Sequence, residues 1–440
     1  MQTYLEQAFG KSDCSSVKMR GAVREWMDLY YGASRSGEDG SARLAVLIVS
    51  KLCRTVFAEY DVHRDKHDDW AQECYTDALN KVAKTAMQYA LIGGECLLKV
   101  VDDHFVPIRR DCYLPLGRDD KGNLTSVGMM QTLYENGKKY VLLERRTDMD
   151  DNTLIENRLF EVNGQALGRR VPLDTLTACK MLSDDEFLPN VPCMGLAVLR
   201  MPTVNCVDGS ADPVSIYAPA VGLMHALARC EDQLNHEFLN GASRVFASED
   251  LLRPDASGAR GLRDDLFVGL PDDPANVGVT VYSPTLREGS YLARKQDILR
   301  SCESLLSLRR GILSETNAET QPRTATEITA ASVDYDLTIR SLQKAWEDCA
   351  GDALFICSCL DRAYHKDDWW PTELSIDWGD GVLYDRSRVW AEQQQMVASG
   401  LLRPEIALAW YYDLPAETEA DLQAVREKYM PVAKGGEKHE

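Results

Sequence analysis

Residues 291–361 constrain this chain more than any other stretch, because two segments with helical spacing of apolar residues flank a polar loop. In the first segment the apolar side chains recur every three or four residues up to about residue 312, which predicts an amphipathic helix. They are Ile298, Cys302, Leu305, Leu308 and Ile312. The loop runs from Leu313 to Arg323 and is almost entirely polar. Such a loop has little reason to pack inside a subunit.

A longer helix is predicted directly after the loop. Thr324 and Glu327 fit the capping box, in which each side chain satisfies an orphan backbone N–H at a helix start. An apolar face then continues to about Leu360; it consists of Ile328, Ala331, Tyr335, Ile339, Leu342, Trp346 and Cys349. A helix of about 36 residues spans roughly 50 Å, more than the width of most globular domains. The pattern therefore favours an elongated assembly over a compact enzyme.

Composition limits the function classes. The 440 residues, 45% of them hydrophobic, are enough for two or three packed modules. The formal net charge of -20 argues against a general nucleic-acid-coating role, because phosphate binding rests on clustered Lys and Arg. An acidic surface does suit a protein that DNA must slide past. The N-terminus lacks the features of a signal peptide, and the longest apolar run, Leu44 to Val49, is too short to span a membrane.

The remaining elements follow from changes in the spacing of apolar residues. Helices are predicted at Ala22–Tyr31, Ala42–Tyr60 and Trp70–Leu91, followed by a stop at Gly93-Gly94. Strands are predicted at Glu95–Val101, Ser126–Tyr134, Lys138–Arg146 and Leu154–Val162, with Asn136-Gly137 as a hairpin turn and irregular strands and loops over 165–212. A helix from Ser215 to about Phe246 precedes an insert, 247–288, with strand-like pieces Leu266–Leu270 and Gly278–Tyr282. The C-terminal part is predicted to contain the strand Glu373–Trp378 and helices at Asp385–Ser399 and Pro404–Tyr412.

No catalytic signature is complete. Gly10-Lys11-Ser12 is a fragment of a phosphate-binding loop, but Leu5 stands where its first Gly belongs. No dinucleotide-binding, serine-hydrolase or zinc-protease motif is present. We therefore expect no enzyme activity, no catalytic residue and no cofactor.

Several groups could in principle bind a metal ion, but each has a simpler explanation. His63 and His67 have helical ligand spacing, yet nothing completes a closed site. His225, Cys230 and His236 lie on different faces or turns of one predicted helix. The thirteen cysteines are scattered, and Cys357-x-Cys359 fits burial of reduced thiols better than metal binding. The acidic runs at 184–186 and 264–265 resemble flexible loops. The pair Trp369-Trp370 could form an exposed stacking platform, but it fits a core anchor better.

The order of these elements resembles the portal proteins of tailed bacteriophages, of the siphovirus type. Trp26-Met-Asp-Leu-Tyr30-Tyr31-Gly32 looks like the portal W-x-x-x-Y-x-G segment, and Ala90 to Lys99 is similar to its A-x-x-x-G-x-x-x-x-K turn. Thr324–Ile328 looks like the start of the long helix after the portal tunnel loop. Ser375–Asp380 resembles the strand that follows that helix. The resemblance covers about residues 15–425, and the short C-terminal region departs from family members with a long crown extension.

The resemblance implies an α+β fold, namely a portal-like subunit in a ring oligomer. Its parts are a helical and β wing (1–212), a first stem helix (213–246), a small α/β clip (247–288) and a second stem helix (289–312). They continue with the tunnel loop (313–323), a long wing–crown helix (324–361) and a short helical crown (362–440). Family members form homo-oligomeric rings, usually of twelve copies, at one capsid vertex of the virion. Double-stranded DNA passes through the ring on packaging and ejection.

The same resemblance implies the partners. They are the terminase large subunit, a head-completion or adaptor protein, the major capsid protein and a scaffold protein, with assembly in the host bacterial cytoplasm and no membrane. The tunnel loop would contribute Ser314, Glu315, Thr316, Asn317, Glu319, Thr320, Gln321 and Arg323 to the DNA channel. The second stem helix would contribute basic belts of Arg294, Lys295, Arg300, Arg309 and Arg310. Alternatively, these cations pair with Glu288, Asp297 and Glu303 of the same or a neighbouring helix.

Two other function classes remain open. One is a metal-dependent enzyme acting on a nucleotide or phosphorylated substrate, with the acidic clusters as metal ligands. The other is a helical scaffold or adaptor that binds only proteins. Ring mass and metal-dependent turnover would separate the portal hypothesis from the enzyme, and an axial channel of duplex width in a particle image would separate it from the scaffold.

Overall fold

A computed structural model describes residues 1–32, 40–63, 70–163, 166–241, 244–248, 267–270, 280–282, 285–315, 325–364, 369–372, 374–379, 386–412, 414, 416 and 418–430. The fold is of the α+β class, as the sequence predicted. The chain divides into two compact units, Met1–Ile376 and Asp377–Glu440. Among the described helices, none is both long enough and apolar enough to cross a bilayer.

Four helices begin the first unit: α1 (Gln2–Phe9), α2 (Val17–Tyr31), α3 (Gly40–Val56) and α4 (Trp70–Gly93). The sequence predicted the last three and missed α1, which is only eight residues long. In α2 the side chain of Ser16 accepts a hydrogen bond from the Met19 amide, and Gly32 ends the helix with φ 58. Both are ordinary signals of helix termini.

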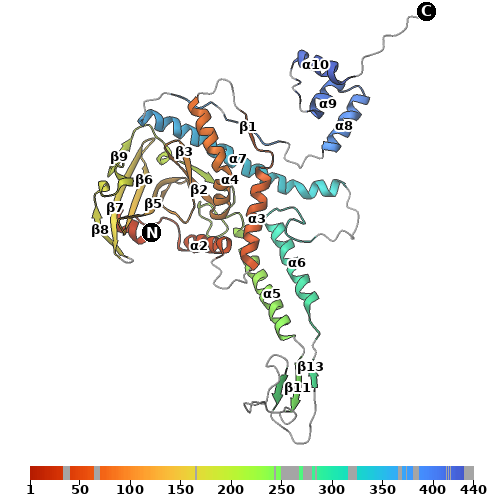
Figure 1. Ribbon diagram of the computed structural model, residues 1–440, viewed down its shortest axis with the longest axis horizontal. Coiled ribbons are helices and arrows are strands. Elements are labelled where there is room, and N and C mark those ends of the chain that lie inside the picture. Colours follow the sequence, from red (N-terminus) through yellow and green to blue (C-terminus); the bar gives the residue numbers. More distant parts are fainter. Residues whose placement is uncertain are drawn as a thin grey trace, which may run out of the picture. The chain divides into compact units, whose positions relative to one another are not determined.

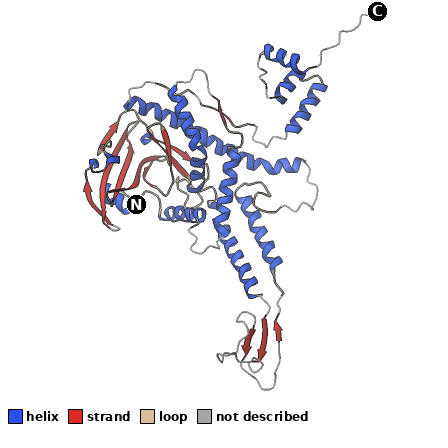
Figure 2. Cartoon of the chain, viewed as in Figure 1, coloured by secondary structure: helices blue, strands red, loops and turns tan. Residues whose placement is uncertain are grey.

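Two antiparallel sheets follow these helices (Figures 1 and 2). The smaller has the strand order β10-β2-β3 and is covered by α4; its strands are β2 (Glu95–Val101), β3 (His104–Ile108) and β10 (Leu196–Arg200). The larger has the order β4-β5-β6-β7-β8, with β9 beside β7. Its strands are β4 (Tyr113–Arg118), β5 (Leu124–Glu135), β6 (Lys138–Asp148), β7 (Thr153–Asn163), β8 (Ala166–Val171) and β9 (Asp185–Leu188).

The predicted hairpin turn at Asn136-Gly137 is confirmed. It joins β5 to β6, and both turn residues have positive φ, 51 and 74. That geometry matches the twist of the flanking strands and explains why Asn-Gly is found there. On this sheet α1 buries Leu5 completely against Val141 and Leu143.

Helices α5 (Val221–Asn240) and α6 (Glu288–Leu305) pack side by side (Figure 1). Ion pairs between Glu237 and Arg287 and between Glu231 and Lys295 show that the two helices run antiparallel. Between them in the chain is a three-stranded sheet of order β12-β11-β13, formed by β11 (Arg244–Ser248), β12 (Phe267–Leu270) and β13 (Thr280–Tyr282). Strand β11 is parallel to β12 and antiparallel to β13. The strand-like pieces predicted at Leu266–Leu270 and Gly278–Tyr282 are confirmed as β12 and β13. Most of the 247–288 insert lies outside the described residues, so the small α/β clip stays a prediction.

Both predicted boundaries of this helix pair need correction. The helix predicted to reach Phe246 ends at Asn240. Gly241 is its C-cap, and the residues from Arg244 onward pair as a strand. The helix predicted to reach Ile312 ends at Leu305, because Ser307 adopts φ 51. The amide of Leu308 then bonds back to the carbonyl of Glu303, and that of Ser307 to Ser304. This is the Schellman arrangement of a helix C-terminus.

Helix α7 (Ala325–Tyr364) has 40 residues and confirms the long helix predicted after the loop. It packs against β10, α3 and α4, with Trp346 fully buried. Tyr335 donates a hydrogen bond to Thr55 Oγ1 on α3, at 2.9 Å. The predicted cap at Thr324 lies outside the described residues.

Further along, two short strands, β1 (Asp61–His63) and β14 (Ser375–Asp377), form a two-stranded sheet. The second unit contains α8 (Arg386–Ala398), α9 (Pro404–Tyr411) and α10 (Glu419–Tyr429). The sequence predicted the first two and missed α10. Its start is a capping box in which Thr418 and Asp421 exchange hydrogen bonds. Asp instead of Glu at the third helical position is the signal that was overlooked.

Candidate functional site

The five predicted basic residues lie on α6 and in the turn after it, and two of them are paired. Arg294 Nη1 lies 2.6 Å from Asp297 Oδ2, one turn along the same helix. Lys295 Nζ lies 2.8 Å from Glu231 Oε1 on α5. Pairing with Asp297 was one of the predicted alternatives, whereas Glu231 was not among the predicted partners. Lys295 therefore contributes to the contact between α5 and α6.

The other three cations, Arg300, Arg309 and Arg310, have exposed side chains. Within the described part of the chain, no carboxylate lies within ion-pair distance of any of them. Arg309 is near enough to Tyr335 to affect its ionisation. Burial raises the pKa of the Tyr335 hydroxyl, and its hydrogen bond with Thr55 and the charge of Arg309 partly offset that rise.

Glu303 occupies a position that the sequence did not reveal. Its side chain is fully buried at the end of α6. Oε1 accepts hydrogen bonds from the backbone amides of Gly311, Leu313 and Ser314, at 3.0, 2.7 and 2.9 Å. Oε2 accepts from the Ser314 hydroxyl at 2.8 Å. Glu303 therefore binds the chain at the start of the predicted loop and is not a partner of the basic residues.

Of the predicted loop residues, Ser314 and Glu315 are described. Ser314 was predicted to line the channel but is only 8% exposed, because its amide and hydroxyl both bond to Glu303. Glu315 is exposed, and its amide donates to Gln296 Oε1 at 2.9 Å. The other predicted loop residues, Thr316, Asn317, Glu319, Thr320, Gln321 and Arg323, lie outside the described residues.

The chain leading into α5 is held by the two N-terminal segments that carry the portal resemblance. Tyr217 donates to the carbonyl of Trp26 at 2.8 Å. The carbonyl of Leu91 accepts from the amide of Ile216 and from the hydroxyl of Ser215, each at 3.0 Å. Segments about 190 and 125 residues apart in sequence are thereby joined at the root of the α5–α6 pair.

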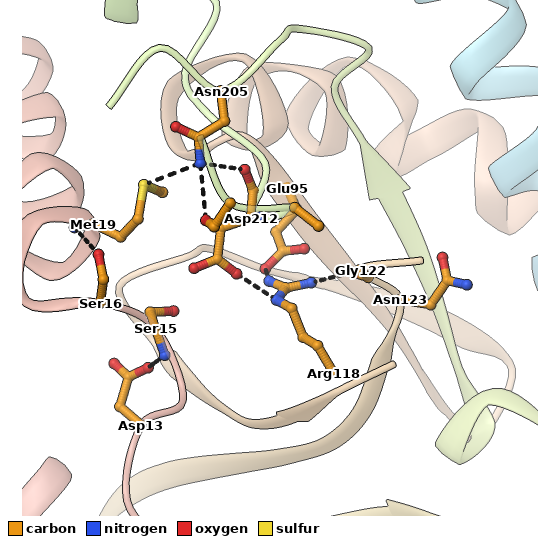
Figure 3. Close-up of polar contacts among 12 residues, drawn as sticks. Asp13, Ser15, Ser16, Met19, Glu95, Arg118, Gly122, Asn123, Asn205 and Asp212 are labelled. Atoms are coloured by element: carbon orange, nitrogen blue, oxygen red, sulfur yellow. Dashed lines mark hydrogen bonds and ion pairs between the residues drawn. The ribbon is translucent and has the colours of Figure 1, made fainter. Parts of the chain in front are cut away.

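A buried ionic cluster lies next to this root (Figure 3). Glu95 is fully buried, with Oε1 2.5 Å from Arg118 Nη2 and 3.4 Å from Arg110 Nε. Burial would raise the pKa of Glu95, but the charges of Arg118 and Arg110 outweigh it and lower the pKa. Arg118 also pairs with Asp212 at 2.6 Å. The cluster fixes the 201–216 segment to β2 and β4.

Asn205 completes this cluster (Figure 3). Its amide nitrogen contacts Asp208 Oδ1 at 2.9 Å, and Ser210 Oγ and the Asp212 carbonyl, each at 3.1 Å. Asp208 in turn accepts a hydrogen bond from Ser16, the cap of α2. The sequence signal was weak, since single polar residues in an irregular segment do not disclose distant partners.

The candidate metal ligands are engaged otherwise. Asp184 and Asp185 pair with Arg170 and Arg158, and His225 pairs with Glu25. Cys357 and Cys359 are buried. Of the predicted core anchor, Trp369 is buried and donates its indole N–H to Asp361, whereas Trp370 is 60% exposed. Among the residues that the structure describes, no group of three or more His, Cys, Asp or Glu side chains could hold a metal ion. His67 and the 264–265 pair lie outside those residues.

A cleft of about 840 Å³ opens between the two sheets of the first unit. Its charged lining includes Glu144, whose two oxygens lie 2.5 Å from Lys99 Nζ and 2.7 Å from Arg146 Nε. The rest is largely apolar and includes Met129, Leu142 and Ile155. Glu144 thus pairs with both Lys99 and Arg146, and this group carries one net positive charge.

No protein-family model matches this chain, and no curated protein matches it. One solved structure that it resembles is described as "Neck of native GTA particle computed with C12 symmetry". The two chains share 10% sequence identity and a TM-score of 0.41, over 94% of this chain and 98% of the other.

Proposed function

We propose that this protein is the subunit of a siphovirus-type portal, a ring at one capsid vertex through which double-stranded DNA is packaged and ejected. The observation that carries the proposal is the arrangement around α5 and α6. An antiparallel helix pair is interrupted by a small sheet, and a loop and a 40-residue helix follow. In the portal interpretation these parts are the stem, the clip, the tunnel loop and the wing–crown helix.

Ring closure requires a head-to-tail interface between identical subunits. Long helices with two usable faces suit this requirement. In α7, Leu342 and Trp346 are buried inside the subunit, while Val333 and Leu337 are exposed. In the ring, the exposed apolar positions of α7 would pack against a neighbouring subunit, usually one of twelve.

The proposed DNA contacts are electrostatic and sparse. Arg300, Arg309 and Arg310, repeated around a ring, would each form a belt of positive charge. One phosphate contact per subunit is weak and salt-sensitive, which suits transient holding during DNA passage. The tunnel loop contains no aromatic residue, so base stacking is not part of the proposal.

The partners follow from the same proposal. The clip, 247–288, would dock the terminase large subunit and later a head-completion or adaptor protein, while the wing would meet the major capsid protein and a scaffold protein. The ATPase activity would belong to the terminase, because this chain has no complete nucleotide-binding loop. Deleting residues 256–262 should weaken docking of both partners. Unchanged binding of both would contradict this role of the clip.

A mass measurement with particle imaging tests the proposal directly. A dodecamer of 49.3-kDa subunits has a mass of about 590 kDa, and negative-stain images should show an axial channel of duplex width. Monomers or dimers at all practical concentrations would contradict it. Metal-dependent turnover of a nucleotide would favour the enzyme alternative, and protein binding without a channel would favour the scaffold.

The loop has its own test. Shortening 313–323, or the substitution Arg323→Glu, should leave ring formation intact and reduce the DNase-protected DNA per particle. Normal DNA content after loop deletion would instead assign the constriction to the belt at Arg309 and Arg310.

A further inference from the structure

The 311–315 segment folds around a single buried side chain. Three of its backbone amides converge on Glu303 Oε1, at 2.7–3.0 Å, and its Ser314 hydroxyl contacts Oε2. Converging backbone amides of this kind form an anion-binding concavity. Within the described residues no Lys or Arg lies within ion-pair distance of Glu303. The amide dipoles and the hydroxyl therefore supply the hydrogen bonds that this buried group requires.

Backbone geometry prepares the segment for this contact. Ser307 with φ 51 reverses the chain after α6, and Gly311 with φ 91 turns it again. The second conformation is strained for any residue with a Cβ. Gln296, about two turns before Glu303, holds the next amide, that of Glu315, at 2.9 Å. Two side chains of α6, Glu303 and Gln296, thus bind four backbone amides and one hydroxyl of this short segment.

We infer that Glu303 is a positioning residue: its carboxylate locks 311–315 onto the end of α6 and so fixes where the chain leaves the stem. The inference rests on the proposed function in one respect, because the position fixed is the start of the proposed tunnel loop. The lock gives the loop a rigid base on the stem helix that carries Arg300. Movement of α6 is then transmitted to the loop.

Hydrogen exchange of peptides covering 308–315 tests the lock. Glu303→Gln keeps the side-chain shape but removes the negative charge and replaces one of the two acceptor oxygens with an NH2 group, so exchange over 311–315 should accelerate about 10-fold or more. The matched control is Glu231→Gln, the same change on α5, which should leave 311–315 unchanged. Ser314→Ala removes only the hydroxyl contact and should have a small effect. The inference would be overturned if residues 311–315 exchanged at the wild-type rate in Glu303→Gln, or if Glu231→Gln accelerated their exchange equally.

A second variant keeps the test decisive if Glu303→Gln does not fold. Gly311→Ala leaves the carboxylate intact but disfavours the backbone conformation that aims the amides at it. It should accelerate exchange over 311–315 while α5 peptides remain as in the wild type. Unaltered exchange over 311–315 would count against the lock.

The functional consequence is measured separately. Glu303→Gln subunits, checked by negative stain, should form rings as the wild type does, but particles assembled with them should contain less DNase-protected DNA than particles assembled with Glu231→Gln subunits. Equal retention in these two variants would overturn the positioning role. If the wild-type protein forms no ring, the proposed portal function is wrong. The exchange measurements still test whether Glu303 holds 311–315 on the end of α6.

Discussion

A Cβ atom built on Gly94 would come within 2.6 Å of the carbonyl carbon of Pro213. Gly94 ends α4 with φ +87, and its carbonyl accepts from the amide of Met201. The helix-to-strand turn is therefore pressed against the segment that leads into α5. Neither the positive φ nor the close approach tolerates a side chain.

Gly94→Ala should lower the free energy of unfolding by roughly 3 kcal/mol or more, because left-handed strain and a backbone clash add together. Urea unfolding of the purified protein measures this. Gly222→Ala is the matched control: that glycine lies inside α5 with open space around its Cβ position. It should be neutral or stabilising by up to about 1 kcal/mol. Equal effects at the two sites would refute the packing argument.

Glu144 should make stability depend on pH in acid. Burial raises the pKa of Glu144, but Arg146 and Lys99 outweigh it, so the pKa falls from 4.5 to about 2. Since the folded-state pKa is depressed, the stabilisation is complete above about pH 4.5 and is lost as the pH falls toward 2. The ionised carboxylate contributes about 3 kcal/mol to the free energy of unfolding.

The comparison is between wild type and Glu144→Gln, by urea unfolding from pH 6 to pH 2.5. The variant should be less stable at pH 6, because Lys99 and Arg146 remain buried without their partner. The difference in free energy of unfolding between wild type and variant should narrow as the pH falls below 4.5. A gap that is constant over this range would show that Glu144 does not titrate as described.

Arg300→Glu should reduce the DNA retained per particle and weaken the salt dependence of retention, since each lost phosphate contact removes one counterion-release term per subunit. Lys180→Glu carries the same charge change on the exposed surface near the large sheet and should behave as wild type. The readout is DNase-protected DNA at two salt concentrations, with ring formation checked by light scattering. Identical losses in both variants would indicate a general charge effect.

Thr418→Ala should destabilise α10 by about 1 kcal/mol, because the capping box loses its hydroxyl. Thr418→Ser retains the hydroxyl and should restore most of the protection. Hydrogen exchange of peptides covering 419–429 measures the effect. If Ser and Ala variants exchange equally fast, the hydroxyl is not what stabilises the start of the helix.

Local sequence determined the elements whose signals are local. The apolar spacing of 325–360 predicts α7, and Asn136-Gly137 predicts the hairpin between β5 and β6, because helix periodicity and turn geometry depend on neighbours a few residues away. The order of elements also suggested the portal interpretation. The same rules failed at Leu308 and Ile312, whose spacing continues a helix that the chain has already left.

Tertiary structure decided the rest. Glu303 reads in sequence as one more charged residue of a basic helix, yet in the fold it is buried and binds the start of the loop. Ser314 reads as exposed loop and is buried for the same reason. Contacts such as Glu95 with Arg118, or Leu91 with Ile216, join segments remote in the chain. A buried polar group is stable only when its hydrogen-bond or ion-pair partners are in place. Tertiary packing decides which residues become those partners, and the spacing of neighbouring residues in the sequence does not indicate them.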